Sequence, residues 1–475
     1  MKTYTFNPRN TYRELPDVFY HNHNPLSFKD ASFVVFNDAL AHKLGLSPDV
    51  VKTKAGLEFI LGNDDKLHPL SMAYAGHQYG HFTILGDGRA HLVMEHQVND
   101  SLFDIHLKGS GPTPFSRGFD GRATLRSALL EYLMSTALDA INIPTTRALA
   151  VIKTGDQINR IGMKNAGILV RVAQSHLRVG TVEYAVYKDS NMYLKPLIDY
   201  AMKRHDPDLI GQKNATISWY DRVIKRQAEL VAKWQAVGFV HGVMNTDNMS
   251  LSGETIDYGP CAFIDTYKRD SVFSSIDTYG RYAFGKQPHM ASWNLAKLGQ
   301  MILPLVDKDK TAAINYVQEA LGRFGDYYET HYYTLMAQKL GFQFSNKETI
   351  KHVDTLLNIM ESHHLDYTET FVQLTYEDNP NFFPDQPAFK NWKRAWQDAT
   401  QKAHQPKALM KRVNPVIIPR NHIVKAVLDD ASTTLDMRRF HQFLNYLKAP
   451  YDITIPKAFR QSNPSDTPFV TTCGT

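Results

Sequence analysis

The segment that most constrains this chain lies at residues 237–259, directly after a long helix-forming stretch. It reads VGFVHGVMNTDN, and Asp257-Tyr258-Gly259 follows nine positions after Asn248. Asparagine and aspartate oxygens are hard ligands that suit Mg²⁺ or Mn²⁺. The segment therefore predicts a cation-binding cluster formed by a loop and a short pair of strands. The alternative is a solvated turn without chemistry.

Hydrophobic periodicity divides the chain into a strand-rich first part and a helical second part. Apolar runs on both sides of Asp87-Gly88 predict a hairpin that ends at Leu85 and resumes at Ala90. Residues 103–108 alternate with period two, which places Lys108 opposite the apolar face. Apolar residues four apart predict a helix over 122–141. Further strands are expected at 148–152 and 167–172, and further helices at 220–237 and within 290–445.

Lys108 is the last residue of the predicted strand at 103–108, and Glu131 lies in the predicted helix at 122–141. A buried lysine needs a carboxylate partner, and protein kinases hold nucleotide phosphates with such a pair beside a glycine-rich hairpin. Gly86 and Gly88 would let backbone N–H groups approach a phosphate. The alternatives are an ordinary hairpin and a surface lysine unrelated to the glutamate.

Arg171 and Arg178 are a second candidate phosphate-binding pair. Seven residues are nearly two helical turns, so on a helix both guanidiniums would lie on one face. Two planar guanidinium groups suit a triphosphate or a pyrophosphate. The alternative is that both arginines are solvated and bind no ligand. The glycine-rich loop that follows Lys108 and contains Asp120-Gly121 fits a nucleotide-facing segment or a plain connection.

Composition excludes several classes of protein. The 475 residues carry 53 Lys and Arg against 48 Asp and Glu, an excess too small to indicate a nucleic-acid-binding protein. No run approaches the roughly 20 apolar residues of a membrane span, and the first residues lack the apolar core of a signal peptide. Two cysteines exclude a disulfide framework. We therefore expect a cytoplasmic enzyme with no membrane or nucleic-acid partner.

Taken together, the motifs resemble the selenoprotein O family of kinase-like protein adenylyltransferases, also catalogued as YdiU-type proteins. The matching stretches lie between Tyr74 and Pro288 and read YAGHQYGHFTILGDGRA, LKGSGPTPFSRGFDGRATLRSALLEYL, IPTTRALAV, RVAQSHLRVGTVEY, WQAVGFVHGVMNTDNMSLSGETIDYGP and GRYAFGKQP. The position directly after His241-Gly242, where small-molecule kinases place an aspartate, is Val243. The resemblance implies that the carboxylate is displaced to Asp247.

The resemblance implies an α+β, protein-kinase-like fold of two lobes that binds ATP in a flipped orientation. AMP would then be transferred to Ser, Thr or Tyr hydroxyls of proteins, with pyrophosphate leaving and Mg²⁺ or Mn²⁺ bound. The implied segments are an N-terminal extension over 1–70, a strand-rich N-lobe over 71–165, a helical C-lobe over 166–455 and a tail over 456–475.

The residue roles that the resemblance implies can be given motif by motif. Asp247 would be the general base, Asn248 and Asp257 the metal ligands, and Glu131 the partner of Lys108. The implied ATP-binding residues are Gly86, Gly88, Arg89, Lys108, Asp120, Gly121, Arg171, Arg178 and Asp257. Three other functions stay open: phosphotransfer with ordinary ATP orientation, UMP transfer from UTP, and a catalytically silent pseudokinase that binds nucleotide.

Both cysteines occupy suggestive places. Family members often carry a selenocysteine or cysteine near the C-terminus, and here that residue is Cys473. Cys261 lies four residues after Asp257. One hypothesis is a regulatory disulfide between the two cysteines. The alternative, which we favour, is a small buried hydrophobe at Cys261 and a free thiol in the tail.

Overall fold

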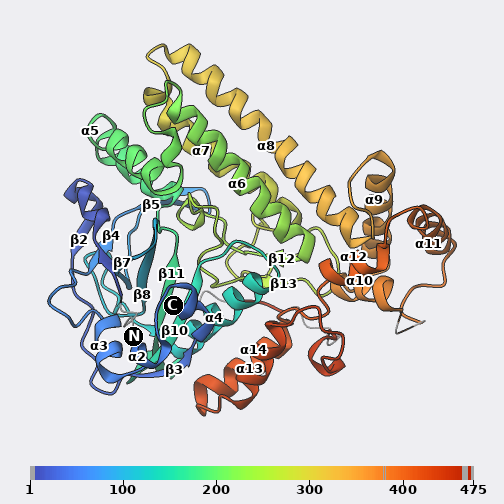
Figure 1. The fold of residues 1–475 in the computed structure, drawn as a ribbon, viewed down its shortest axis with the longest axis horizontal. Coiled ribbons are helices and arrows are strands. Elements are labelled where there is room, and N and C mark those ends of the chain that lie inside the picture. Colours follow the sequence, from blue (N-terminus) through green and yellow to red (C-terminus); the bar gives the residue numbers. More distant parts are fainter. Residues whose placement is uncertain (1–5, 378, 380, 463–468, 472–475) are drawn as a thin grey trace.

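The computed structural model describes residues 6–377, 379, 381–462 and 469–471, and Figure 1 shows a large sheet beside an array of helices. Nine strands form one sheet whose main order is β2-β4-β7-β8-β11-β10-β3; β1 pairs with β7 and β9 with β11. Its strands are β1 (Pro8–Arg9), β2 (Tyr20–Asn22), β3 (Ser32–Phe36), β4 (Leu70–Met72), β7 (Ala90–Val98), β8 (Ser101–Lys108), β9 (Ala123–Thr124), β10 (Arg147–Arg160) and β11 (Gly162–Ala173). Two further pairs are β5 (Ala75–Gln78) with β6 (His81–Ile84), and β12 (Phe239–Val240) with β13 (Ala262–Phe263).

Helices dominate the chain after residue 178. The first four are α1 (Asp38–Lys43), α2 (Pro48–Val51), α3 (Lys54–Ile60) and α4 (Leu125–Ala140). The others are α5 (Val179–His205), α6 (Ala215–Val237), α7 (Gln287–Val306), α8 (Lys310–Lys339), α9 (Lys347–Ser362), α10 (Tyr367–Tyr376), α11 (Pro387–Thr400), α12 (Pro406–Val413), α13 (Asn421–Thr433) and α14 (Arg438–Leu447). The predicted strands at 148–152 and 167–172 and the predicted helix at 220–237 are confirmed as parts of β10, β11 and α6.

The sheet is buried on both faces. Ile105 and Leu107 of β8 pack with Leu40 of α1 and Ile60 of α3 in one apolar cluster. Helix α4 covers the opposite face, where its apolar side chains join a second cluster with Leu169 of β11. The alternation predicted for 103–108 is therefore confirmed, and its apolar face packs on helices from the first seventy residues.

Helix α4 is held from two sides. It begins after Thr124, whose side chain accepts a hydrogen bond from Ser127 N, and it ends at Ala140, close to the predicted limits. On its outer side lie α13 and α14 (Figure 1). Arg126 Nε contacts Asp429 Oδ1 at 3.1 Å, and the rings of Tyr132 and Phe440 are 6.5 Å apart. The C-terminal helices thus press α4 against the sheet.

The predicted hairpin around Asp87-Gly88 is wrong. Strand β6 pairs with β5, whereas β7 pairs with β4 at Leu70↔Leu92 and with β8. The reason is the backbone of the connecting loop, because Leu85 N donates to Tyr74 O and Asp87 N donates to Met72 O. The Asp87 carboxylate also accepts from Met72 N and from the His106 ring. These bonds tie the loop to the residues beside β4, instead of aligning β6 with β7.

The structure gives a mixed α/β protein with a large antiparallel sheet and many helices. The sheet includes β2 and β3 from the first seventy residues, and β11 runs across the predicted boundary at residue 165. The division into an extension, two lobes and a tail therefore stays a prediction. None of the helices that the structure describes combines the length and the hydrophobicity that a membrane span requires.

Candidate active site

One cavity of about 2270 Å³ lies between the sheet, α4 and the loops that follow α6. Every sequence-predicted site residue that the structure describes lines it: Gly86, Gly88, Arg89, Lys108, Asp120, Gly121, Glu131, Arg171, Arg178, Asp247, Asn248, Asp257 and Cys261. Cys473 lies outside the described residues. The structure thus brings together motifs spread over 175 positions of the chain.

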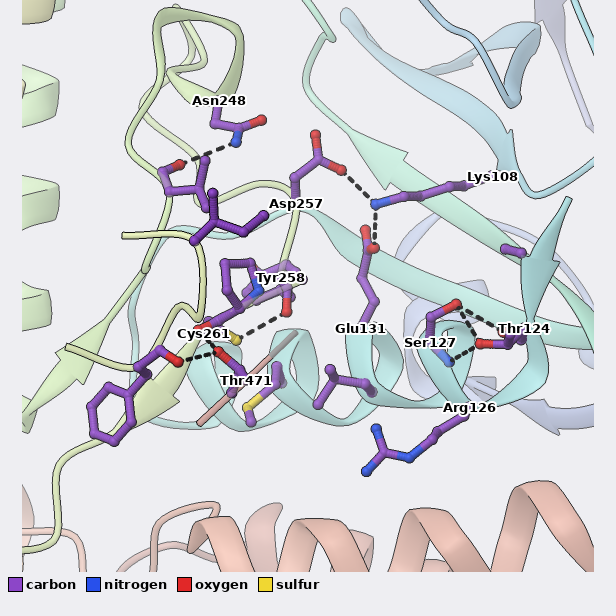
Figure 2. A pocket seen from close by; sticks show the side chains of 18 of the residues that line it. Lys108, Thr124, Arg126, Ser127, Glu131, Asn248, Asp257, Tyr258, Cys261 and Thr471 are labelled. Carbon is purple, nitrogen blue, oxygen red and sulfur yellow. Dashed lines mark hydrogen bonds and ion pairs between the residues drawn. The ribbon is translucent and has the colours of Figure 1, made fainter. Parts of the chain in front are cut away.

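Lys108 joins two carboxylates in this cavity. Its Nζ lies 2.8 Å from Glu131 Oε2 and 2.5 Å from Asp257 Oδ1. Figure 2 marks both contacts with dashed lines. Lys108 ends β8, Glu131 projects from the middle of α4, and Asp257 lies in the loop before β13. Asp257 adopts a φ of 62°, a left-handed conformation that is uncommon for a residue with a side chain. The chain therefore turns sharply where it presents this carboxylate to the lysine.

The two arginines reach the same carboxylate, but they do so from a strand and a loop and not from one face of a single helix. Arg171 belongs to β11, and Arg178 is the residue directly before α5. Arg171 Nη2 contacts Asp257 Oδ1 at 2.6 Å, and Arg178 Nη1 contacts Asp257 Oδ2 at 3.4 Å. Strand β11 ends at Ala173, and four loop residues connect it to Arg178. This loop, and not a helix, brings the Arg178 guanidinium to the same site as Arg171.

The cluster carries more positive than negative charge. Lys108, Arg171 and Arg178 face only Glu131 and Asp257 in these ion pairs. Burial alone would raise the pKa of Asp257, but Arg171, Lys108 and Arg178 hold it well below its ordinary value. Both carboxylates therefore stay ionised, and one positive charge is left over. Such an excess in a buried site suits an anion such as a phosphate chain.

Asp247 differs from Asp257 because no cation compensates for its burial directly. Its Oδ1 atom is buried and has no hydrogen-bond partner among the described residues, while Gln78 Nε2 lies 3.5 Å from Oδ2. Burial raises the pKa of Asp247 to about 6, and Arg178 opposes this shift only in part. A buried carboxylate with a free lone pair and a pKa near neutrality has the properties of a general base.

Asn248 and Asp257 fit a divalent cation. Asn248 Nδ2 donates to Val243 O at 3.1 Å, so Oδ1 is the amide atom that remains for another ligand. Both residues line the cavity with oxygen atoms. No group of three or more His, Cys, Asp or Glu side chains suited to a metal occurs in the described part of the chain. A magnesium ion held by one or two protein oxygens and by substrate phosphates matches this sparse donor set.

The loop that contains Gly86 and Gly88 packs closely against Phe115. A Cβ on Gly86, which has a φ of 125°, would lie 2.4 Å from the Phe115 ring. A Cβ on Gly88 would lie 2.8 Å from Phe115 O. The two glycines are therefore needed to let the 109–122 loop pack against this loop. In that second loop Asp120 is ion-paired with Arg160, whose hydrogen bond lowers the pKa of the carboxyl.

Several positioning residues escaped the sequence analysis. Asn245 Oδ1 accepts hydrogen bonds from Tyr79 N at 3.1 Å and from the Tyr282 hydroxyl at 2.5 Å. Thr246 Oγ1 donates to Glu183 Oε2 at 2.8 Å, and Glu183 Oε1 is 2.7 Å from His77 Nδ1. These contacts fix the residues directly before Asp247. The partners are 37 to 166 positions apart, so no local spacing could have revealed them.

Cys261 is buried near the metal-ligand candidates. Its Sγ donates to Tyr258 O at 3.3 Å, and burial raises the pKa of the thiol far above its ordinary value. The residue therefore behaves as a small buried hydrophobe in this structure. Its pairing with Cys473 stays a hypothesis, because Cys473 is not among the described residues.

Comparisons with known proteins show the family of the chain. Residues 2–448 match the family model described as "Protein adenylyltransferase SelO". A protein of Clostridium perfringens (strain 13 / Type A) named "Protein nucleotidyltransferase YdiU" is 44% identical over 483 residues, covering 99% of this chain and 98% of that protein. Proteins of the same name from Bacillus cereus (strain G9842) and Bacillus mycoides (strain KBAB4) are each 45% identical, with the same coverage.

The fold, the cation-rich cavity and these relatives define an enzyme of the protein nucleotidyltransferase class. The buried Asp247 carboxylate and the excess of positive charge in the same cavity are compatible with that class. Within that class, the chain belongs to the SelO family of protein adenylyltransferases. The resemblance seen in the sequence is thereby confirmed.

Proposed function

We propose that the protein transfers AMP from ATP to Ser, Thr or Tyr hydroxyls of protein substrates and releases pyrophosphate. The observation that carries this proposal is the buried cluster in which Lys108, Arg171 and Arg178 surround Asp257, beside the unpartnered oxygen of Asp247. Anion binding and proton acceptance are the two requirements of transfer to a hydroxyl, and both groups line one cavity.

The proposal includes a protein-kinase-like arrangement with a flipped nucleotide. The side chains of Arg171 and Arg178 are 2% and 3% exposed, whereas Lys108 is 17% exposed. Planar guanidinium forks suit the pyrophosphate part of ATP. If the β- and γ-phosphates bind at these buried arginines, the α-phosphate is the one left for the acceptor hydroxyl.

The reaction then needs one proton transfer. The acceptor hydroxyl oxygen attacks the α-phosphorus, its proton passes to Asp247 Oδ1, and the bond from the α-phosphorus to the bridging oxygen breaks. Lys108, Arg171 and Arg178 stabilise the charge that develops on the leaving pyrophosphate. Asn248 and Asp257 would hold Mg²⁺ or Mn²⁺, which supplies further positive charge to the phosphates when bound.

The test is transfer of label from two forms of ATP. The protein is incubated with α-³²P-ATP and, separately, γ-³²P-ATP, each with Mg²⁺ and then with Mn²⁺. Protein-bound label from the α position alone is the expected result, and it should be lost in Lys108→Ala and Asp247→Ala. Lys195→Ala is the matched control, because the Lys195 side chain is 67% exposed and is ion-paired with Asp199 one helical turn away.

Each other outcome points to a different enzyme. Label from the γ position would replace the proposal with ordinary phosphotransfer. Stronger labelling from α-³²P-UTP than from ATP would replace AMP with UMP as the transferred group. ATP binding without transfer to any acceptor tried would favour a silent pseudokinase.

A further inference from the structure

We propose that the backbone edge at residues 273–275 binds the acceptor protein as an added extended strand. This inference rests on the proposed function and names its substrate class, which is an extended or unfolded polypeptide segment that presents free backbone N–H and C=O groups. The site would recognise the acceptor mainly through backbone hydrogen bonds and less through its side chains.

The evidence is a segment of this chain that already occupies the edge. Thr471 N donates to Phe273 O at 2.8 Å, and Ser275 N donates to Thr471 O at 3.0 Å, which makes a parallel bridge between Ser274 and Thr471. The Thr471 hydroxyl also donates to Pro260 O at 2.9 Å. Phe273–Ser275 therefore offers both a donor and an acceptor to a strand laid beside it.

This edge belongs to the wall of the candidate active site. Phe273 and Ile276 line the same cavity as Asp247 and Asp257, and so do the described tail residues, Phe469 to Thr471. Pro260, which contacts Thr471, is three positions after Asp257. Figure 2 shows Thr471 next to Tyr258 and Cys261. These two residues belong to the segment that directly follows Asp257. A strand on this edge would lie within the cavity that holds the candidate base.

The tail segment, Phe469 to Thr471, is held on this edge by few contacts, so another strand can replace it. Its strand contacts are backbone hydrogen bonds at one residue, and Val470 is 56% exposed. Phe469 approaches the Phe273 ring only at 6.5 Å between centroids. Beside the edge, Ile276 is 54% exposed, so an apolar side chain of an incoming strand has a surface to cover. An acceptor strand can make the same bonds and gain this contact.

The first test measures peptide binding, which does not depend on catalysis. The probe is a fluorescent peptide with the sequence Pro-Phe-Val-Thr-Thr, blocked at both ends, and the reading is fluorescence anisotropy under reducing conditions. Thr471→Pro in the full chain removes the N–H that bonds to Phe273 O and so frees the edge. Because competition by the tail is removed, we expect the peptide to bind this variant about tenfold more tightly than the wild type.

Two controls sharpen the binding test. Val470→Ala changes an exposed neighbour and keeps all backbone donors, so its peptide affinity should equal that of the wild type. A peptide N-methylated at its first threonine lacks the N–H that pairs with Phe273 O, so it should lose binding to Thr471→Pro. Equal affinity of the methylated and unmethylated peptides for Thr471→Pro would overturn the proposal.

The second test separates this proposal from the proposed function. Label transfer from α-³²P-ATP to dephosphorylated β-casein, a disordered acceptor, is measured as KM and kcat for casein. We expect Thr471→Pro to lower the KM for casein severalfold at unchanged kcat and unchanged KM for ATP. Unchanged KM for casein would overturn the acceptor-strand site alone. Absence of AMP transfer in every protein would instead count against the proposed function, while the peptide test still decides whether the edge binds a strand.

Discussion

Arg171 Nη2 lies 2.6 Å from Asp257 Oδ1 and 2.6 Å from Glu131 Oε1. One guanidinium from the centre of the sheet therefore ties a loop carboxylate to the helix that bears Glu131. The Arg171 side chain is 2% exposed, so solvent cannot replace either contact. Arg171 is thus both a candidate phosphate ligand and the residue that joins three elements of the fold.

Removal of this guanidinium should destabilise the protein. Arg171→Ala leaves two buried carboxylates with fewer cations, and breaking a buried ion pair on one side costs about 3–5 kcal/mol. Urea unfolding followed by tryptophan fluorescence measures the change. Arg438→Ala is the control, because that arginine side chain is 90% exposed and an exposed ion pair adds little to stability. Equal losses in both variants would contradict the role assigned to Arg171.

The rate of transfer should fall in acid with an apparent pKa near 6. The pKa of Asp247 is raised to about 6 by burial, so the carboxyl is protonated below that pH and cannot accept a proton. A profile of kcat/KM between pH 5 and pH 8 is expected to rise and then level off. Asp247→Asn should abolish transfer at every pH, and a flat profile in the wild type would remove Asp247 from the role of base.

Gly76 should be intolerant of a single methyl group. A Cβ at this position would lie 2.3 Å from Asp247 Oδ1, so Gly76→Ala must displace the base. We expect kcat to fall about a hundredfold, the effect of a displacement of roughly 1 Å. Gly322→Ala in α8 is the same chemical change with no atom within 4 Å of the new Cβ, and it should keep full activity. Circular dichroism of both variants checks that the fold is retained.

Asn248 should matter for nucleotide binding only when a divalent cation is present. Calorimetric titration with ATP in Mg²⁺ and in EDTA separates the two contributions. Asn248→Ala should weaken binding in Mg²⁺ by about tenfold or more and leave the binding in EDTA unchanged. Lys108→Ala, by contrast, is expected to weaken both. Loss of binding in EDTA for Asn248→Ala would mean that this side chain acts on the nucleotide rather than on the metal.

Lys339 should make stability depend on pH far from the active site. Burial among aromatic rings lowers its pKa to about 7, and its Nζ lies 4.1 Å from the centroid of Phe371. Between about pH 7 and 10.5 the unfolded chain binds this proton and the folded chain does not, so stability rises with pH across that window. Lys339→Met should be more stable at pH 7, with a smaller rise to pH 9 in urea unfolding. An unchanged slope would show that Lys339 is not the titrating group.

Local spacing predicted those features that depend on neighbouring residues. The alternation at 103–108 predicted the face of Lys108, and the apolar stripe at 122–141 predicted both ends of α4 within three residues. The meeting of Lys108 with Glu131 followed from the resemblance to kinases and is present at 2.8 Å. Family motifs also selected residues that line one cavity.

Features that depend on distant partners could not be predicted. The strand predicted at 167–172 contains Arg171, but the seven-residue spacing alone did not show that a loop would bring Arg178 to the same carboxylate as Arg171. The Asp87-Gly88 pair suggested a hairpin, but Met72 and His106 bind the Asp87 side chain and fix a different loop. In the Asp87-Gly88 loop, long-range contacts overrode a local preference.

The position of α13 and α14 on the outside of α4 has a consequence for biosynthesis. The helix that carries Glu131 is supported by residues 421–447, which leave the ribosome about 300 residues after Glu131 itself. A nascent chain that has completed its sheet still lacks this outer support. The candidate active-site cavity consequently reaches its final form only after residues 421–447 have been synthesised and have packed on α4.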